Sequence, residues 1–108
     1  MSKIRVLLAD DHPLILAGIR ACFSAAPDLA VVGEAGDGQQ VQRLSRELRP
    51  DVLLLDLSMP GPPSGDIVSY LGEHCPDTKI LVLTAHNEDA LARGLIKAGV
   101  AGYVLKDE

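Results

Sequence analysis

The sequence predicts a single α/β domain built on a doubly wound, five-stranded parallel sheet. Apolar runs of strand length, without polar alternation, alternate with longer amphipathic stretches, as is typical of a sheet covered on both faces. With 108 residues, of which 47% are hydrophobic, the chain can bury one core and is too short for a second. Polar residues follow several runs, at the edge where such sheets carry their ligand sites.

Five runs rich in Val, Leu and Ile are expected to form the strands, and four amphipathic stretches between them are expected to form the helices. The expected strands are residues 4–9, 29–33, 52–57, 80–84 and 102–105. The expected helices are residues 13–26, 39–48, 64–74 and 88–98.

Local signals define the ends and the inner faces of these helices. Pro13 suits the first helical position, and the second helix should end before Pro50, because a residue that precedes proline disfavours the α region. Asn87 is expected to cap the start of the last helix, and Gly99 is expected to end it. The residues expected to face the core are Ile15, Ile19, Cys22, Val41, Leu44, Leu48, Ile67, Leu71, Leu91 and Leu95.

Charge and cysteine content exclude several classes of protein. The formal net charge is −5 and the basic residues are scattered, which argues against a domain that binds nucleic-acid phosphates by itself. The apolar run at the N-terminus is too short for a signal peptide or a membrane span, so we expect a cytosolic protein without a membrane partner. Cys22 and Cys75 stand in apolar helical patterns and are expected to be reduced core residues.

The ends of four expected strands carry side chains that could bind a ligand or take part in a reaction. Asp10 and Asp11 follow the first strand, Asp56 ends the third, Thr84 ends the fourth and Lys106 follows the fifth. In a doubly wound sheet these ends meet at one edge, so three carboxylates should converge and hold either protons or a cation. Oxygen ligands favour Mg²⁺, since the histidines lack the spacing of a zinc site. The hydroxyl and the ammonium group then suit a phosphoryl ligand.

These residues resemble the receiver domains of two-component response regulators, and the resemblance covers residues 3–107. The matching segments are Asp10-Asp11, residues 55–61 (LDLSMPG), Thr84-Ala85 and residues 103–106 (YVLK). The start of the chain, DDHPL followed by GIR at residues 18–20, resembles the subgroup with a NarL/LuxR-type helix-turn-helix output domain.

The resemblance implies a phosphoacceptor site. Asp56 would take a phosphoryl group from a sensor histidine kinase. Asp11, the carboxylate of Asp56 and the backbone carbonyl of Ser58 would hold Mg²⁺, with Asp10 on a metal-bound water. Lys106 would neutralise charge on the phosphoryl oxygens. The domain would then be no general enzyme, because it catalyses only its own phosphorylation and dephosphorylation.

The resemblance also implies a switch. Thr84 would bond the new phosphoryl group and Tyr103 would rotate inward, which would change a surface formed by the fourth strand, the fourth helix and the fifth strand. DNA would be bound only through an output domain outside this chain. Ser58 and His86 occupy the positions that tune access of water to the acyl phosphate in this family.

Three other interpretations use the same residues differently. A haloacid-dehalogenase-type phosphatase needs a second Asp two positions after the first, where this chain has Ser58. A flavodoxin-type carrier needs a phosphate-binding loop after the first strand, and the carboxylates of Asp10 and Asp11 would repel the phosphate. An unphosphorylated, receiver-like interaction module is the remaining alternative.

Two features depart from the family pattern. Pro62, Pro63 and Ser64 precede Gly65, one residue more than usual, so we expect a stiffer loop and a changed start of the third helix. The receiver, residues 1–108, stops where the family's fifth helix would begin. In the flavodoxin-like order 2-1-3-4-5, which the resemblance implies, the crossover rule would then leave one sheet face half bare. We expect a fragment of a longer regulator or a homodimer that buries this face.

Overall fold

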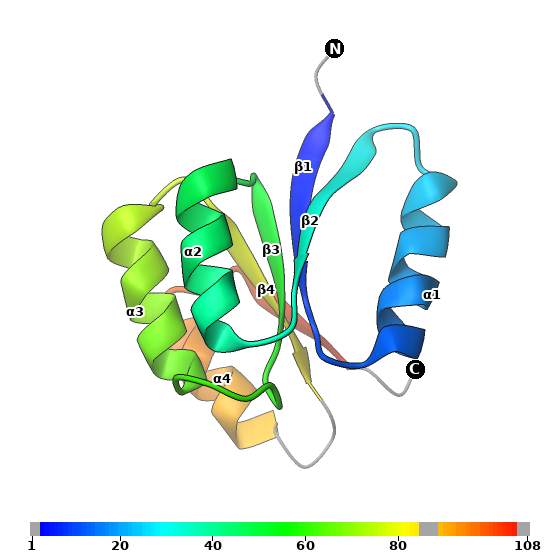
Figure 1. Ribbon diagram of the computed structural model, residues 1–108. Coiled ribbons are helices and arrows are strands. Elements are labelled where there is room, and N and C mark those ends of the chain that lie inside the picture. Colours follow the sequence, from blue (N-terminus) through cyan, green and yellow to red (C-terminus); the bar gives the residue numbers. More distant parts are fainter. Residues whose placement is uncertain (1–2, 85–88, 106–108) are drawn as a thin grey trace.

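The computed structural model describes residues 3–84 and 89–105, and in this part of the chain five parallel strands and four helices alternate (Figure 1). The sheet order is β2-β1-β3-β4-β5, which confirms the predicted fold class. The elements are β1 Ile4–Ala9, α1 Pro13–Ser24, β2 Leu29–Ala35, α2 Gly38–Leu48, β3 Val52–Asp56, α3 Ser64–His74, β4 Lys79–Thr84, α4 Asp89–Lys97 and β5 Gly102–Leu105.

Right-handed crossovers decide which face each helix covers. The chain steps from β1 to β2 in one direction and afterwards in the other, so α1 lies on one face and α2, α3 and α4 lie on the opposite face (Figure 1). Pro13 opens α1, as expected. Asp37 caps α2 by accepting a hydrogen bond from the backbone N–H of Gln40 at 2.8 Å. Gly99 follows α4 with a φ of 116°, the left-handed conformation expected of a helix stop.

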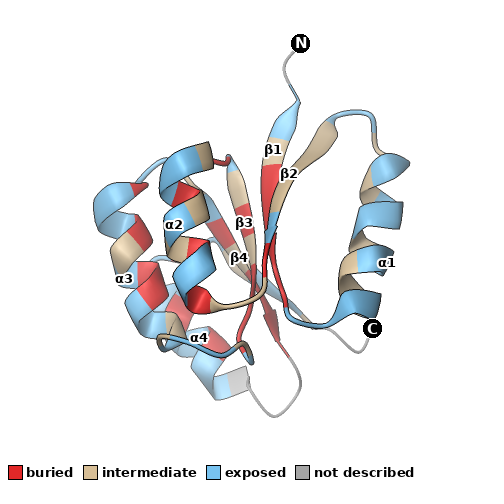
Figure 2. Cartoon of the chain, in the orientation of Figure 1, coloured by how far each residue is buried: buried red, intermediate tan, exposed pale blue. Residues whose placement is uncertain are grey.

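The main core lies between the sheet and the three helices α2, α3 and α4 (Figure 2). Leu53 of β3 and Val82 of β4 are fully buried at its centre. Val41 and Leu71 meet them from the helices, as their helical spacing predicts. Burying each such side chain stabilises the fold by roughly 1.5–3 kcal/mol, so this layer holds the strand ends in place.

The packing of α1 differs from the prediction. None of its residues is buried: Ile15 and Ile19 are half-buried, and Cys22 is exposed rather than in the core. The reason is that α1 lies beside β1 and β2 at one side of the sheet, with no other helix of the described residues on its face. Cys75 is buried and free, as expected.

The prediction for α4 is half right. Leu95 is buried, but Leu91 is 47% exposed and Ala92 takes the inner position instead. Ala92 and Leu95 are separated by three residues and so share the helix face toward the sheet, whereas Leu91 lies on its flank. The capping residue predicted for this helix, Asn87, lies outside the described residues.

The face of the sheet beside α1 is apolar and incompletely covered. Arg20 of α1 pairs with Glu34 at 2.8 Å, and Glu34 stands next to Leu8 in the sheet register. Leu54 and Leu81 continue that row across β3 and β4 and are only half-buried. Beyond them, Val104 of β5 is 50% exposed. No helix in the described part of the chain is long and apolar enough to span a membrane.

We expect the 108-residue chain to expose this face in solution. It should bind a hydrophobic dye or form dimers as its concentration rises, because large apolar patches on soluble proteins favour association. Light scattering after size exclusion across a dilution series, with dye fluorescence on each fraction, measures both effects. A monomer that binds no dye at any concentration would contradict the prediction.

Candidate functional site

Three predicted site residues meet at the carboxyl edge of the sheet. Asp10 directly follows β1, Asp56 ends β3 and Thr84 ends β4, and these three strands are neighbours. Their exposed fractions are 1%, 1% and 0%. Polar groups buried this deeply are held in fixed positions, because they lose their contact with water and must be stabilised by the protein or a ligand. Lys106 and His86 lie outside the described residues.

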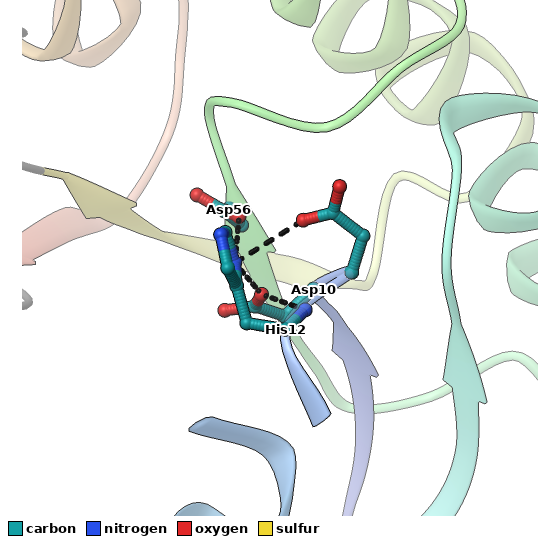
Figure 3. A group of neighbouring side chains, drawn as sticks. Asp10, His12 and Asp56 are labelled. Carbon is teal, nitrogen blue, oxygen red and sulfur yellow. Dashed lines mark hydrogen bonds and ion pairs between the residues drawn. The ribbon is translucent and has the colours of Figure 1, made fainter. Parts of the chain in front are cut away.

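A carboxylate cluster surrounds the imidazole of His12 (Figure 3). The Nδ1 atom of His12 lies 2.7 Å from Oδ1 of Asp10, 3.1 Å from Oδ1 of Asp11 and 3.5 Å from Oδ2 of Asp56. The backbone N–H of His12 also donates to Oδ1 of Asp10 at 2.8 Å. The turn after β1 thus brings Asp11 and His12 back over the buried carboxylates of the two central strands.

Ser58 fixes the carboxylate of Asp56. Its backbone N–H and its hydroxyl both donate to Oδ1, at 3.2 Å and 3.0 Å. Because both hydrogen bonds come from a residue two positions later, the turn after β3 orients the Asp56 side chain locally. The family resemblance assigns the backbone carbonyl of Ser58 to the metal, whereas the two hydrogen bonds to Asp56 come from its amide and hydroxyl groups.

The chemistry of the cluster fits a hard divalent cation. One ligand atom from each of Asp10, Asp11, His12 and Asp56 lies within 4.8 Å of all the others. Three carboxylates at this spacing repel one another, and a cation relieves that repulsion. Oxygen donors suit Mg²⁺, and Asp11, whose side chain is 37% exposed, lies on the solvent side of the cluster.

His12 is the site residue that sequence reasoning did not assign. It directly follows the acidic pair, and its imidazole contacts all three carboxylates. The available signal was its position, two residues beyond Asp10, where a tight turn returns the chain toward the strand end. Its Nδ1 atom lies among the oxygens that a cation would contact.

Tyr103 lies one strand away from Thr84. It stands next to Val82 in the register of β4 and β5 and is 38% exposed. The hydroxyl predicted to sense the ligand and the aromatic side chain predicted to respond to it therefore belong to neighbouring strands.

The loop after Asp56 packs against the start of α2. Gly61 has a φ of 109°, and a Cβ atom there would come within 2.9 Å of the Gly38 nitrogen, so only glycine fits without strain. The backbone N–H of Gly38 donates to the carbonyl of Pro60 at 2.9 Å. Pro63 then directly precedes α3. The segment after Asp56 is thus joined to α2 by the Pro60 carbonyl and leads into α3 at Pro63.

Comparison with known proteins identifies the family. Residues 6–108 match the sequence model described as the response regulator receiver domain. The chain belongs to this family. Similar proteins include two transcriptional regulatory proteins of Bacillus subtilis, LiaR (43% identical over 103 residues, 95% of this chain) and YxjL (41% over 105, 97%). The nitrate/nitrite response regulator NarL of Escherichia coli is 40% identical over 102 residues, 94% of this chain. The subgroup is the NarL/LuxR type, as predicted.

Solved structures give the same result. The receiver resembles the signal receiver domain of the NarL protein from Mycobacterium tuberculosis with a TM-score of 0.91 and 36% identity, over all of this chain and 87% of that one. RcsB of Salmonella enterica, solved bound to promoter rprA in the presence of BeF3-, matches with a TM-score of 0.90 and 34% identity over 99% of this chain and 62% of that one. The receiver spans about half the length of the curated relatives, from 47% to 49%.

Proposed function

We propose that this receiver accepts a phosphoryl group on Asp56 from a sensor histidine kinase and thereby switches a signalling surface. The observation that carries the proposal is the buried carboxylate of Asp56, oriented by Ser58 and surrounded by two further carboxylates at the carboxyl edge of the sheet. Membership in the receiver family supports the same assignment.

The chain's own residues perform the transfer by positioning. The Asp56 carboxylate attacks the phosphorus atom, an O–P bond forms, and the bond from phosphorus to the donor's imidazole nitrogen breaks. The two hydrogen bonds from Ser58 hold the carboxylate for this in-line approach. Lys106 is assigned to neutralise negative charge on the phosphoryl oxygens, and Thr84 to donate its hydroxyl to one of them.

Asp10, Asp11, Asp56 and the carbonyl of Ser58 are the residues that would hold Mg²⁺. The ion, when bound, supplies positive charge against the carboxylates and the incoming phosphoryl group. The His12 imidazole lies between the three carboxylates, next to the oxygens that would hold the ion.

A phosphodonor experiment separates this function from its rivals. The receiver is incubated with acetyl phosphate and Mg²⁺, and intact mass and free phosphate are followed in time. One added, labile phosphoryl group per chain supports the proposal. Continuous phosphate release with turnover would indicate a phosphatase, and neither signal would indicate an interaction module that works without phosphorylation.

We further propose that the receiver controls a helix-turn-helix output domain and works in the cytoplasm. The relatives it matches are about twice as long, and two of them, LiaR and YxjL, are transcriptional regulatory proteins. Contact with DNA is assigned to that output domain, because this chain carries a net charge of −5. In the working protein, a further helix or a second copy of the receiver would cover the apolar face beside α1.

Thr84→Ala should separate phosphorylation from switching. The hydroxyl of Thr84 is buried at the end of β4, beside the strand that carries Asp56. Its loss should leave phosphorylation of Asp56 largely intact but prevent the structural change that follows phosphorylation. Amide chemical shifts of residues 91–103, compared before and after phosphorylation in the variant and the parent, provide the measurement. Identical shift changes in both proteins would remove Thr84 from the switch.

Ser58 and His86 should set the lifetime of the acyl phosphate. Ser58 lies beside the acceptor and is exposed, and neither side chain is bulky enough to exclude water strongly. Replacing either residue with a larger or charged side chain should change the rate of phosphate loss. Intact mass followed after removal of the phosphodonor gives that rate. Unchanged lifetimes for variants at both positions would assign the control of hydrolysis to another residue.

A further inference from the structure

A polar groove lies between the outer face of α2 and the side of α3 that carries Tyr70. It is on the face of the sheet opposite α1 (Figure 1). Its volume is about 530 Å³, within the range of about 300–1,000 Å³ that is typical of small-molecule sites. Three arginines, two glutamines, one glutamate and one tyrosine line it. None of these residues belongs to the acidic cluster at the strand ends.

The groove is basic in an acidic protein. Arg43, Arg46 and Arg49 are half of the six arginines in a chain with a net charge of −5. Arg43 and Arg46 are three residues apart and share one side of α2, and Arg49, which directly follows the helix, lines the same groove. Glu47 is the single carboxylate in the lining, and it lies 3.5 Å from Arg43 at the surface. The groove therefore carries an excess of positive charge.

Arg46 is anchored at the wall of the groove. Its guanidinium donates to the hydroxyl of Tyr70 at 3.4 Å. Tyr70 is itself fixed, because it packs against the core and its ring centroid lies 4.4 Å from that of His74. The hydrogen bond to Tyr70 raises the pKa of Arg46 above its usual value. The remaining N–H groups of Arg46 are thus available in a defined place as a permanent cation.

Arg49 occupies a backbone position that normally favours glycine. It follows α2 with a φ of 47°, where a side chain is strained and glycine is the usual residue. Its N–H donates to the carbonyl of Ser45 at 3.0 Å, and its own carbonyl accepts from the Arg5 guanidinium at 2.9 Å. The backbone at Arg49 is therefore held by hydrogen bonds. Arginine suits this left-handed position less well than glycine, but it adds a third cation to the groove.

We propose that this groove binds a small polyanion with two or more phosphoryl groups, held by the guanidinium groups of Arg43, Arg46 and Arg49. The planar guanidinium group matches two phosphate oxygens at once, and three such groups in one groove match a chain of phosphates better than a single phosphate. Gln39 and Gln42 add amide donors at the same wall. A polyanion bound there would contact α2, Arg49 and Tyr70 and no residue of the acidic cluster.

Binding of inorganic triphosphate tests the proposal. Calorimetric titration uses the 108-residue chain at physiological ionic strength, in buffer stripped of divalent ions with a chelating resin, so that the acidic cluster repels the probe. We expect one saturable site, with triphosphate bound at least about tenfold more tightly than orthophosphate. Arg46→Gln should lower the affinity for triphosphate about tenfold, which corresponds to the loss of one charge-assisted hydrogen bond. Amide shifts on triphosphate binding should map to residues 39–49 and Tyr70.

Arg49→Gly distinguishes a binding role from a structural one. Glycine relieves the left-handed strain, so the thermal midpoint should equal or exceed that of the parent while triphosphate affinity falls about tenfold. Arg20→Gln is the matched control: it removes the same group on the opposite face of the sheet, and affinity should stay within about twofold. Absence of saturable binding, equal losses in Arg20→Gln and Arg46→Gln, or tighter binding of a hexaglutamate peptide than of triphosphate would overturn the proposal.

Discussion

Asp56→Asn should abolish phosphorylation of the receiver. The amide lacks the charge and the nucleophilic oxygen that form the O–P bond, while its size and the Ser58 hydrogen bonds to its carbonyl oxygen can be retained. Intact mass after incubation with acetyl phosphate and Mg²⁺ should show one added phosphoryl group in the parent and none in the variant. The expected effect is a complete loss of label.

The matched control is Asp66→Asn, an exposed carboxylate in the first turn of α3. It makes the same chemical change away from the acidic cluster, and its labelling should equal that of the parent. Circular dichroism of both variants shows whether the fold is retained. Full labelling of Asp56→Asn would place the acceptor elsewhere.

Asp11→Asn should strongly raise the Mg²⁺ concentration that phosphorylation requires. The Asp11 side chain is partly exposed and contributes one of three negative charges around the cation position. Its removal should raise the Mg²⁺ concentration for half-maximal labelling by about tenfold or more, in line with the cost of altering groups around a metal. Labelling rates across a Mg²⁺ series, with Asp77→Asn as an exposed control, measure the effect. An unchanged Mg²⁺ dependence in Asp11→Asn would remove this carboxylate from the metal site.

The sheet and its functional edge could be predicted because they depend on local patterns. Continuous apolar runs marked the strands, and all strands of a parallel sheet end at the same edge. The strand order then puts β1, β3 and β4 side by side, so Asp10, Asp56 and Thr84 meet at that edge, where they are buried. Pro13 and Gly99 marked helix ends because each restricts or permits a particular backbone angle.

The parts that were wrong depend on neighbours that a sequence pattern does not contain. Cys22 was assigned to the core from its spacing alone, but burial also requires a second layer against α1. Leu91 was predicted to face the core from its i, i+4 spacing with Leu95, but the orientation of the helix turns Ala92 toward the sheet instead. His12 was not assigned because its contacts come from a turn, in which no periodicity predicts side-chain direction.

The most direct test of the central claim locates the phosphoryl group chemically. The receiver is treated with acetyl phosphate and Mg²⁺, reduced with borohydride to convert an acyl phosphate into homoserine, digested and analysed by peptide mass spectrometry. We expect homoserine at position 56 alone, and no homoserine when Mg²⁺ is chelated before the phosphodonor is added. An unmodified Asp56 beside another modified residue, or the same yield without Mg²⁺, would contradict the claim.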